Sequence, residues 1–235
     1  MENISITSLN INFCNGFKSS IHRNVNEVVD ELLIEDSTFI AIQEFGSHSM
    51  TNDIDGGALI KILGQKGYEL IENEKKARYP VNTCIFYKSC KVEFLEKLNP
   101  IYDKVQNRQC GARFLVNGRM IDLYSLHLPL YSNNKEIKIK FWKEILKYAR
   151  KTDNDVILAG DFNESRLPSN PTMLAENIYD LENYFTDAST QEPTWRESKL
   201  DHIFISRNLA EKNLFYKTLA TKISDHKKLR LDILL

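Results

Sequence analysis

The hydrophobic positions of the chain follow two different spacings, which predict strands and helices. Short apolar or alternating runs, rich in β-branched and aromatic residues, are typical of buried or half-buried strands. They lie at residues 4–11, 38–42, 68–71, 82–87, 92–98, 112–116, 120–126, 156–163 (a strand and the loop that ends it), 200–206, 214–219 and 229–235. The pattern therefore favours a protein built mainly from strands.

Four further segments are expected to be helical, at residues 24–36, 58–65, 135–150 and 171–180. In the first and third of these, apolar residues recur every three or four positions, which is the spacing of an amphipathic helix. Pro171 fits the first turn of the last one, where its missing N–H is not needed. These helices are predicted to lie on the surface and to cover the sheets.

Local and global features of the chain indicate a single folding unit. Asn117 and Gly118 separate two of the predicted strands, and Asn-Gly between alternating apolar residues predicts a tight β-hairpin. No linker, repeat or low-complexity tract interrupts the 235 residues, of which 42% are hydrophobic, enough for a sizeable core. We therefore expect one domain over residues 1–235.

Charge and cysteine content narrow the classes of function. The chain has 31 basic and 32 acidic residues and a net charge of −1, which excludes a global polycation that binds nucleic acid through overall charge. Recognition of a phosphate must therefore be local. The four cysteines lack paired metal-type spacing, and no apolar run is long enough to cross a bilayer. We expect reduced thiols, no transmembrane segment and a cytoplasmic location.

The most informative stretch begins where the apolar run from Val156 ends. Gly160 suits a strand exit, and Asp161 and Asn163 follow it two positions apart, so that both are expected to face one side of the backbone. Carboxylate and carboxamide oxygens are ligands that Mg²⁺ prefers. Alone, this pattern is explained as well by an Asx turn that closes a strand.

Other predicted strand ends carry chemically useful side chains as well. These are Asn10, Asn12, Glu44, His127, Asp201, Asp225 and His226. Each has a simpler explanation on its own, as a solvated charge, an edge histidine or a turn residue. Together they form the set needed for metal-assisted phosphoester hydrolysis: carboxylates for Mg²⁺, a base for water and donors for the developing charge.

Six short motifs at these strand ends resemble, in order, the motifs of the endonuclease/exonuclease/phosphatase superfamily. They are Leu9-Asn10-Ile11-Asn12, Ile42-Gln43-Glu44, Ser125-Leu126-His127, Gly160-Asp161-Phe162-Asn163, Leu200-Asp201-His202 and Ser224-Asp225-His226. The resemblance implies an α/β fold, a four-layer αββα sandwich of two mainly antiparallel sheets flanked by helices, with a catalytic pocket at one end. The strand count and the covering helices agree with it.

The resemblance also implies a role for each motif residue. Glu44 looks like the principal Mg²⁺ ligand, assisted by Asp225 and Asn12, with Mn²⁺ able to replace Mg²⁺. Asp161 looks like the residue that orients or deprotonates the attacking water, and Asn163 like a donor to the scissile phosphate.

Two histidines are expected to act on the phosphate. His226 resembles a phosphate clamp whose other ring nitrogen is fixed by Asp201, which should also raise the pKa of His226. His127 is similar to the histidine of deoxyribonuclease-like and sphingomyelinase-like members, where it would stabilise phosphate charge or protonate the leaving oxygen. His202 follows Asp201 on a strand and should point to the opposite face.

The substrate is expected to be a nucleic-acid phosphodiester, which makes the protein a DNA or RNA endonuclease or exonuclease. The histidine pattern favours it, as do basic residues that could flank the pocket, Arg78, Arg108, Arg113, Lys222, Lys227 and Lys228. Substrate contacts are assigned to Asn10, Asn163, His127 and Arg113. The alternatives are a small nucleotide, a phosphoinositide or a phospholipid headgroup, and a non-catalytic binding module on the same fold.

Overall fold

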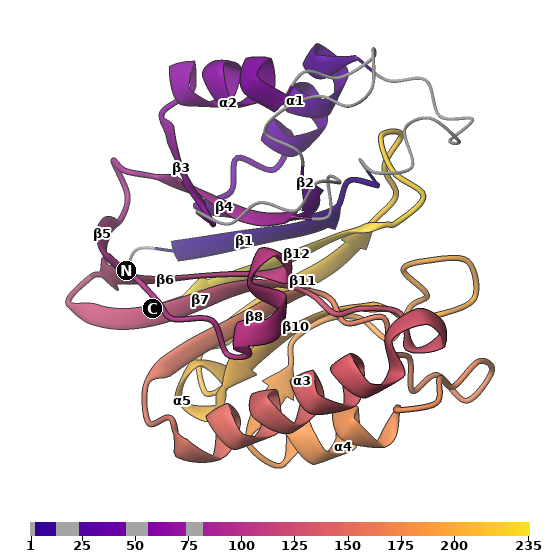
Figure 1. Cartoon of the computed structure of the whole chain (residues 1–235). Coiled ribbons are helices and arrows are strands. Elements are labelled where there is room, and N and C mark those ends of the chain that lie inside the picture. Colours follow the sequence, from indigo (N-terminus) through magenta and orange to yellow (C-terminus); the bar gives the residue numbers. More distant parts are fainter. Residues whose placement is uncertain (1–2, 13–23, 46–55, 74–81) are drawn as a thin grey trace.

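Two six-stranded sheets pack face to face in the computed structural model, which describes residues 3–12, 24–45, 56–73 and 82–235 (Figure 1). The first sheet has the order β11 (Asn213–Leu219), β12 (Lys228–Leu234), β1 (Asn3–Asn10), β2 (Phe39–Phe45), β4 (Asn82–Lys88), β3 (Tyr68–Glu72). The second has the order β5 (Glu93–Lys97), β6 (Gln109–Val116), β7 (Arg119–His127), β8 (Asp155–Asp161), β10 (Asp201–Ser206), β9 (Phe185–Asp187).

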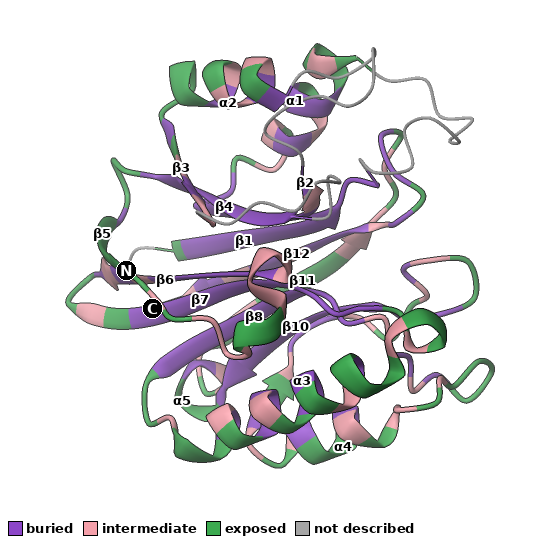
Figure 2. Ribbon diagram, viewed as in Figure 1, coloured by how far each residue is buried: buried purple, intermediate pink, exposed green. Residues whose placement is uncertain are grey.

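Helices cover the outer face of each sheet. α1 (Val25–Leu33) and α2 (Gly56–Gln65) pack on the first sheet, and α3 (Tyr131–Lys151) and α4 (Glu176–Glu182) pack on the second (Figure 1). A 3₁₀ segment, η2 (Asp103–Arg108), and a short helix, α5 (Arg207–Ala210), complete the described elements. Buried positions follow most of the strands, with β5 and β11 as exposed edge strands, and exposed positions lie on the outer faces of the helices (Figure 2). The predicted four-layer αββα sandwich is confirmed.

The strand pairing is mainly antiparallel, as predicted. Among the described strands only β1 with β2 and β7 with β8 run parallel. The apolar core between the sheets includes Phe39 of the first sheet and Phe114 of the second, whose ring centroids lie 4.8 Å apart. Burial of such large rings against each other is the main favourable contribution to this packing.

The predicted hairpin is confirmed in detail. Val116 pairs with Arg119, and the two residues between them both have positive φ, 51° at Asn117 and 79° at Gly118. Positive φ at both central positions defines the type I′ turn, whose twist matches that of the two strands.

Several predicted boundaries differ from the structure, and two of these differences have a clear structural cause. β2 does not stop before Gln43 but continues to Phe45, with a register shift between Ile42 and Phe45 and a φ of 56° at Glu44. This bulge gives Glu44 a direction that simple alternation does not predict.

The helix expected at 171–180 begins only at Glu176. Before it, the N–H of Thr172 donates to the Ser165 carbonyl at 2.8 Å, and the Ser165 N–H donates to Thr172 Oγ1 at 2.8 Å. Because these contacts tie the segment around Pro171 to the loop after β8, it does not form a first helical turn.

No helix among the described residues combines the length and the apolar composition that a bilayer crossing requires. The cytoplasmic location and the single domain over 1–235 stay predictions. Arg78, one of the basic residues expected to flank the pocket, lies outside the described residues, as do His22 and His48, which belong to none of the six motifs.

Gly160 is required by the close approach of β8 to β7. A Cβ atom on Gly160 would lie 1.9 Å from the carbonyl oxygen of Leu126, and the φ of Gly160 is 151°. Gly160→Ala is therefore expected to lower the free energy of unfolding by about 3 kcal/mol, measured by urea denaturation. Gly64 in α2 is the control, because a Cβ there meets no atom within 4 Å. Gly64→Ala should raise stability by about 0.5 kcal/mol; equal effects of the two changes would contradict the role given to Gly160.

Candidate active site

The strand ends of both sheets meet around one cavity of about 380 Å³. The predicted residues that line it are Asn12, Glu44, His127, Asp161, Asn163, Asp225 and His226. Pairing within the second sheet sets His127 beside Asp161, and Asp161 beside Asp201. Residues from distant parts of the chain are thus brought together because their strands end at the same edge.

Asn10 joins the two sheets at this edge. It ends β1 of the first sheet, and its Nδ2 donates to Asp161 Oδ2 of the second sheet at 3.0 Å. Its Oδ1 accepts from the N–H of Asn12 at 2.9 Å. Asn10 is buried and is not among the cavity-lining residues, so the contact that the structure describes is with Asp161.

Asp161 and Asn163 form an Asx turn at the end of β8. The N–H of Asn163 donates to Asp161 Oδ1 at 2.8 Å, and Asn163 has a φ of 50°. Asn163 Nδ2 donates to the carbonyl of Leu128 at 2.8 Å. The simpler explanation, an Asx turn, is therefore present, and the same turn directs both side chains into the cavity.

His226 and Asp201 form a buried pair. His226 Nδ1 lies 2.9 Å from Asp201 Oδ2, which leaves Nε2 as the nitrogen for a ligand. Burial opposes protonation of the ring, but the charge of Asp201 and its hydrogen bond, with smaller contributions from Asp161 and Asp225, raise the pKa of His226 to about 10. His226 is therefore a charged donor at neutral pH.

Arg108 determines which nitrogen of His127 carries the proton. Arg108 Nη1 lies 3.2 Å from His127 Nδ1, and a guanidinium only donates hydrogen bonds, so Nδ1 must accept. The proton of His127 then sits on Nε2, which lies 3.7 Å from Glu44 Oε1 and 3.8 Å from Asp161 Oδ2. In this arrangement His127 is a neutral donor that faces the two carboxylates.

The donor atoms of the site fit a divalent cation. Asn12 Nδ2 donates to Asp225 Oδ1 at 2.6 Å, so the Asn12 side chain offers its oxygen to a cation, beside the carboxylates of Glu44 and Asp225. The polar atoms of Asp161, Asp201 and His226 also lie within 4.8 Å of one another, but the protonated ring of His226 has no lone pair for a cation, so His226 is a donor beside the cation and not one of its ligands. Asp201 Oδ1 is buried and has no hydrogen-bond partner among the described residues. Such oxygen-rich surroundings suit Mg²⁺ or Mn²⁺.

Sequence patterns did not reveal several residues of the cavity wall. Trp195 lines the cavity, donates from Nε1 to Asp225 Oδ2 at 2.9 Å and lies beneath the guanidinium of Arg196, 4.3 Å from the ring centroid. Leu130, Asn133 and Asn134 form another part of the wall at the start of α3. The only indications in the sequence were their positions just before the Asp201 motif and just after the His127 motif.

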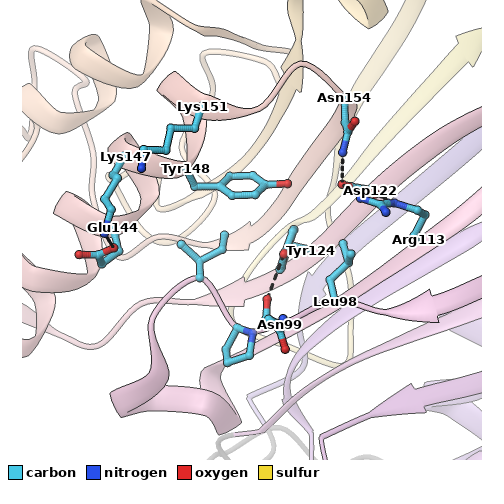
Figure 3. Close-up of a pocket in the computed structure, with 12 residues that line it drawn as sticks. Leu98, Asn99, Arg113, Asp122, Tyr124, Glu144, Lys147, Tyr148, Lys151 and Asn154 are labelled. Carbon is cyan, nitrogen blue, oxygen red and sulfur yellow. Dashed lines mark hydrogen bonds and ion pairs between the residues drawn. The ribbon is translucent and has the colours of Figure 1, made fainter.

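Arg113 is not brought to this cavity. Its guanidinium donates twice to Asp122, at 2.7 and 3.0 Å, and once to Glu96 at 2.7 Å. It lines a different cavity, between α3 and the second sheet, where Asn154 also donates to Asp122 (Figure 3). The contact with the substrate that the sequence suggested is not supported by this position, because the cation is already paired with carboxylates.

Two other predictions concern residues beside the site. His202 points to the opposite face from Asp201, as expected, and its ring lies between Asp187 Oδ2 at 2.9 Å and the carbonyl of Glu164 at 3.0 Å. Lys228 is buried and pairs with Glu31, and Arg108 is the arginine among the cavity-lining residues.

Comparisons with known proteins agree with the observed fold. The model of the family described as "Endonuclease/Exonuclease/phosphatase family" matches residues 7–226. The structure of D. rerio TDP2 complexed with single strand DNA product is similar, with 16% identity, a TM-score of 0.75 and coverage of 100% of both chains. An AP endonuclease from Archaeoglobus fulgidus has 15% identity and a TM-score of 0.73, over 99% of this chain and 100% of that one.

The human Nocturnin catalytic domain with bound sulfate anion is also similar, with 15% identity, a TM-score of 0.73 and coverage of 99% of this chain and 94% of that one. At such identities these likenesses establish the fold alone. No curated protein matches the sequence.

Asp201→Asn is expected to lower the pKa of His226 well below about 10, because the neutral amide no longer balances the cost of burying the charged ring. The measurement is an NMR titration of the imidazole nitrogens in metal-free protein. A raised pKa stabilises the fold below the ordinary value of about 6.5, and this contribution disappears as pH rises through about 10. The variant should therefore lose less stability than the parent between pH 6.5 and 10. An unchanged pKa would show that Asp161 and Asp225 are enough to keep the pKa of His226 raised.

Proposed function

We propose that this chain, which belongs to the endonuclease/exonuclease/phosphatase family, is a metal-dependent phosphodiesterase that cleaves nucleic acid by in-line attack of water. Members of the family are hydrolases of phosphoesters. The observation that carries the proposal is the shared cavity, where Glu44, Asp225 and His226 from the first sheet and its loops face His127, Asp161 and Asn163 from the second.

The two sides of the cavity divide the chemistry between them. Glu44 and Asp225, with the oxygen of Asn12, would hold a divalent cation, which when bound neutralises charge on the phosphoryl oxygens. On the other side, Asp161 orients the attacking water and accepts its proton. Its two oxygens are held by Asn10 and Asn163, so its position is fixed before the substrate binds.

The donors of the site stabilise the phosphate as charge develops on it. His226 is a protonated imidazole fixed by Asp201, and Asn163 presents its carboxamide from the same wall as Asp161. His127 offers Nε2–H to a non-bridging or leaving oxygen. His226 and His127 are held by Asp201 and Arg108, which limits the rearrangement needed during the reaction. Asn163 Nδ2, in contrast, would exchange its longer bond, the one to Asp161 Oδ2 at 3.3 Å, for the phosphate.

The cavity wall favours a nucleic-acid substrate over a headgroup. The indole of Trp195 is stacked with Arg196, and both an aromatic face and a guanidinium plane can stack on a nucleobase. Arg108 adds a cation beside the phosphate-facing His127. This local charge is compatible with a net charge of −1 for the whole chain.

The proposed activity is tested with a panel of substrates in Mg²⁺ or Mn²⁺: plasmid, single-stranded DNA, abasic duplex, RNA, sphingomyelin and inositol phosphates. We expect cleavage of nucleic acid and a loss of at least about 10³-fold in kcat in Asp161→Ala, because water loses its positioned base. Turnover of a lipid or small phosphoester alone would contradict the substrate assignment. Absence of turnover with every phosphoester would favour a binding module.

Glu44→Gln is expected to raise the Mg²⁺ concentration needed for half-maximal activity by about tenfold or more, since an amide is a weaker ligand than a carboxylate. Metal affinity is measured directly by calorimetry, with Arg113→Gln as a control that changes a charge outside the cavity. Equal metal affinity in Glu44→Gln and the parent would rule out Glu44 as a ligand.

A further inference from the structure

A lysine is buried directly behind the loop that follows β8 and contains Asn163. Lys138 of α3 is 0% exposed, although helices of this kind direct lysines to solvent. Its Nζ donates to the carbonyl oxygen of Asn163 at 2.6 Å and lies 2.6 Å from Glu164 Oε1. The ammonium therefore contacts the main chain of the residue whose side chain faces the phosphate cavity.

Glu164 fixes the position of this ammonium. It is fully buried, and its Oε2 accepts from the N–H of Leu174 at 3.1 Å and from the hydroxyl of Thr172. Its carbonyl faces His202 Nε2 at 3.0 Å. The Glu164 carboxylate is thus held from several directions, and Lys138 is held by it.

This arrangement is a costly way to stabilise a fold. Burial lowers the pKa of Lys138, with the charge of Glu164 acting in the opposite direction. Two apolar residues of the same volume often give equal or greater stability than a buried ion pair. What an apolar residue cannot do is donate a hydrogen bond to the Asn163 carbonyl. That carbonyl belongs to a residue in the left-handed region, with a φ of 50°, a conformation that asparagine adopts more readily than most residues and that the bond from Lys138 restrains further.

We propose that Lys138 is a positioning residue, which holds the Asn163 main chain so that the carboxamide faces the scissile phosphate. This inference rests on the proposed function. Asn163 is then restrained at three points: by Asp161 at its N–H, by Leu128 at its side chain and by Lys138 at its carbonyl. Lys138 itself is not among the cavity-lining residues and acts only through Asn163.

The test distinguishes a positioning role of Lys138 from a contribution to the stability of the fold by removing the charges of Lys138 and Glu164 together. Lys138→Met leaves the carboxylate of Glu164 buried and unpaired, so it is expected to lower the melting temperature strongly. The double variant Lys138→Met/Glu164→Gln contains no buried charge at this point and should recover most of that loss. Its kcat should nevertheless stay at least about tenfold below the parent with KM changed less than about threefold, because only the transition-state contact of Asn163 is weakened.

Two controls make the comparison specific. Ile145→Ala removes apolar contacts two turns further along α3 and should lower the melting temperature while kcat, assayed well below melting, stays at the parent value. Glu164→Gln removes the carboxylate that holds Lys138 but keeps the amine that bonds to the Asn163 carbonyl, so its kcat should lie between those of the parent and the double variant. Full recovery of kcat in the double variant, or an equal loss in either control, would overturn the proposal.

A structural measurement distinguishes this proposal from the proposed function. If the parent hydrolyses no phosphoester, the proposed function fails, and the role of Lys138 is decided by the crystal structure of the double variant. We expect the Asn163 φ to leave the value of 50° and the bond from its Nδ2 to Leu128 to be lost. Retention of both would overturn the positioning role whether or not the parent is active. If no Lys138 variant folds, the kcat of Glu164→Gln tests the proposal instead. A tenfold loss of kcat in that variant would assign the loss to the ion pair between Lys138 and Glu164, and would overturn the role of the bond from Lys138 to the Asn163 carbonyl.

Discussion

The cavity that forms the candidate active site depends on a small set of polar contacts between the two sheets. Asn10 of the first sheet donates to Asp161 of the second, and Gln43 Nε2 donates to Ser125 Oγ at 3.0 Å one strand away. An apolar interface alone is non-directional and would permit one sheet to slide over the other. These directional contacts set the register, so that the carboxylates from the first sheet stand opposite Asp161 and Asn163 of the second.

Charged groups beside the cavity are also held in place by partners within the protein. Two ion pairs beside the cavity are buried, Asp201 with His226 and Glu164 with Lys138. A buried ion without a partner is destabilising by several kcal/mol, so each pair must form as the strands and helices come together. The donors are therefore already oriented in the folded protein, which is what stabilisation of a developing phosphoryl charge requires.

The sequence predicted eleven of the twelve described strands and the Asn117-Gly118 hairpin, because each depends on local periodicity or turn chemistry. It missed β9, which has only three residues. It did not predict that Arg113 pairs with Asp122 or that Lys138 is buried. Both depend on which face of an element meets another element, and a single sequence does not encode that locally. The late start of α4 has the same origin, since the contacts of Thr172 with the loop after β8 are tertiary.

The Asx turn at Asp161 closes a strand and also places two side chains in the candidate site, so the structural and the functional explanation of this motif are both valid. The turn satisfies the N–H of Asn163 locally, as it does in many proteins. Its geometry nevertheless sends the carboxylate and the carboxamide to the same cavity, and the carbonyl that the turn leaves on the other side is the one that Lys138 reaches. Because the turn is stable without contacts from other elements, it fixes both side chains at the end of β8. The charged groups around the cavity then determine which chemistry these side chains can perform.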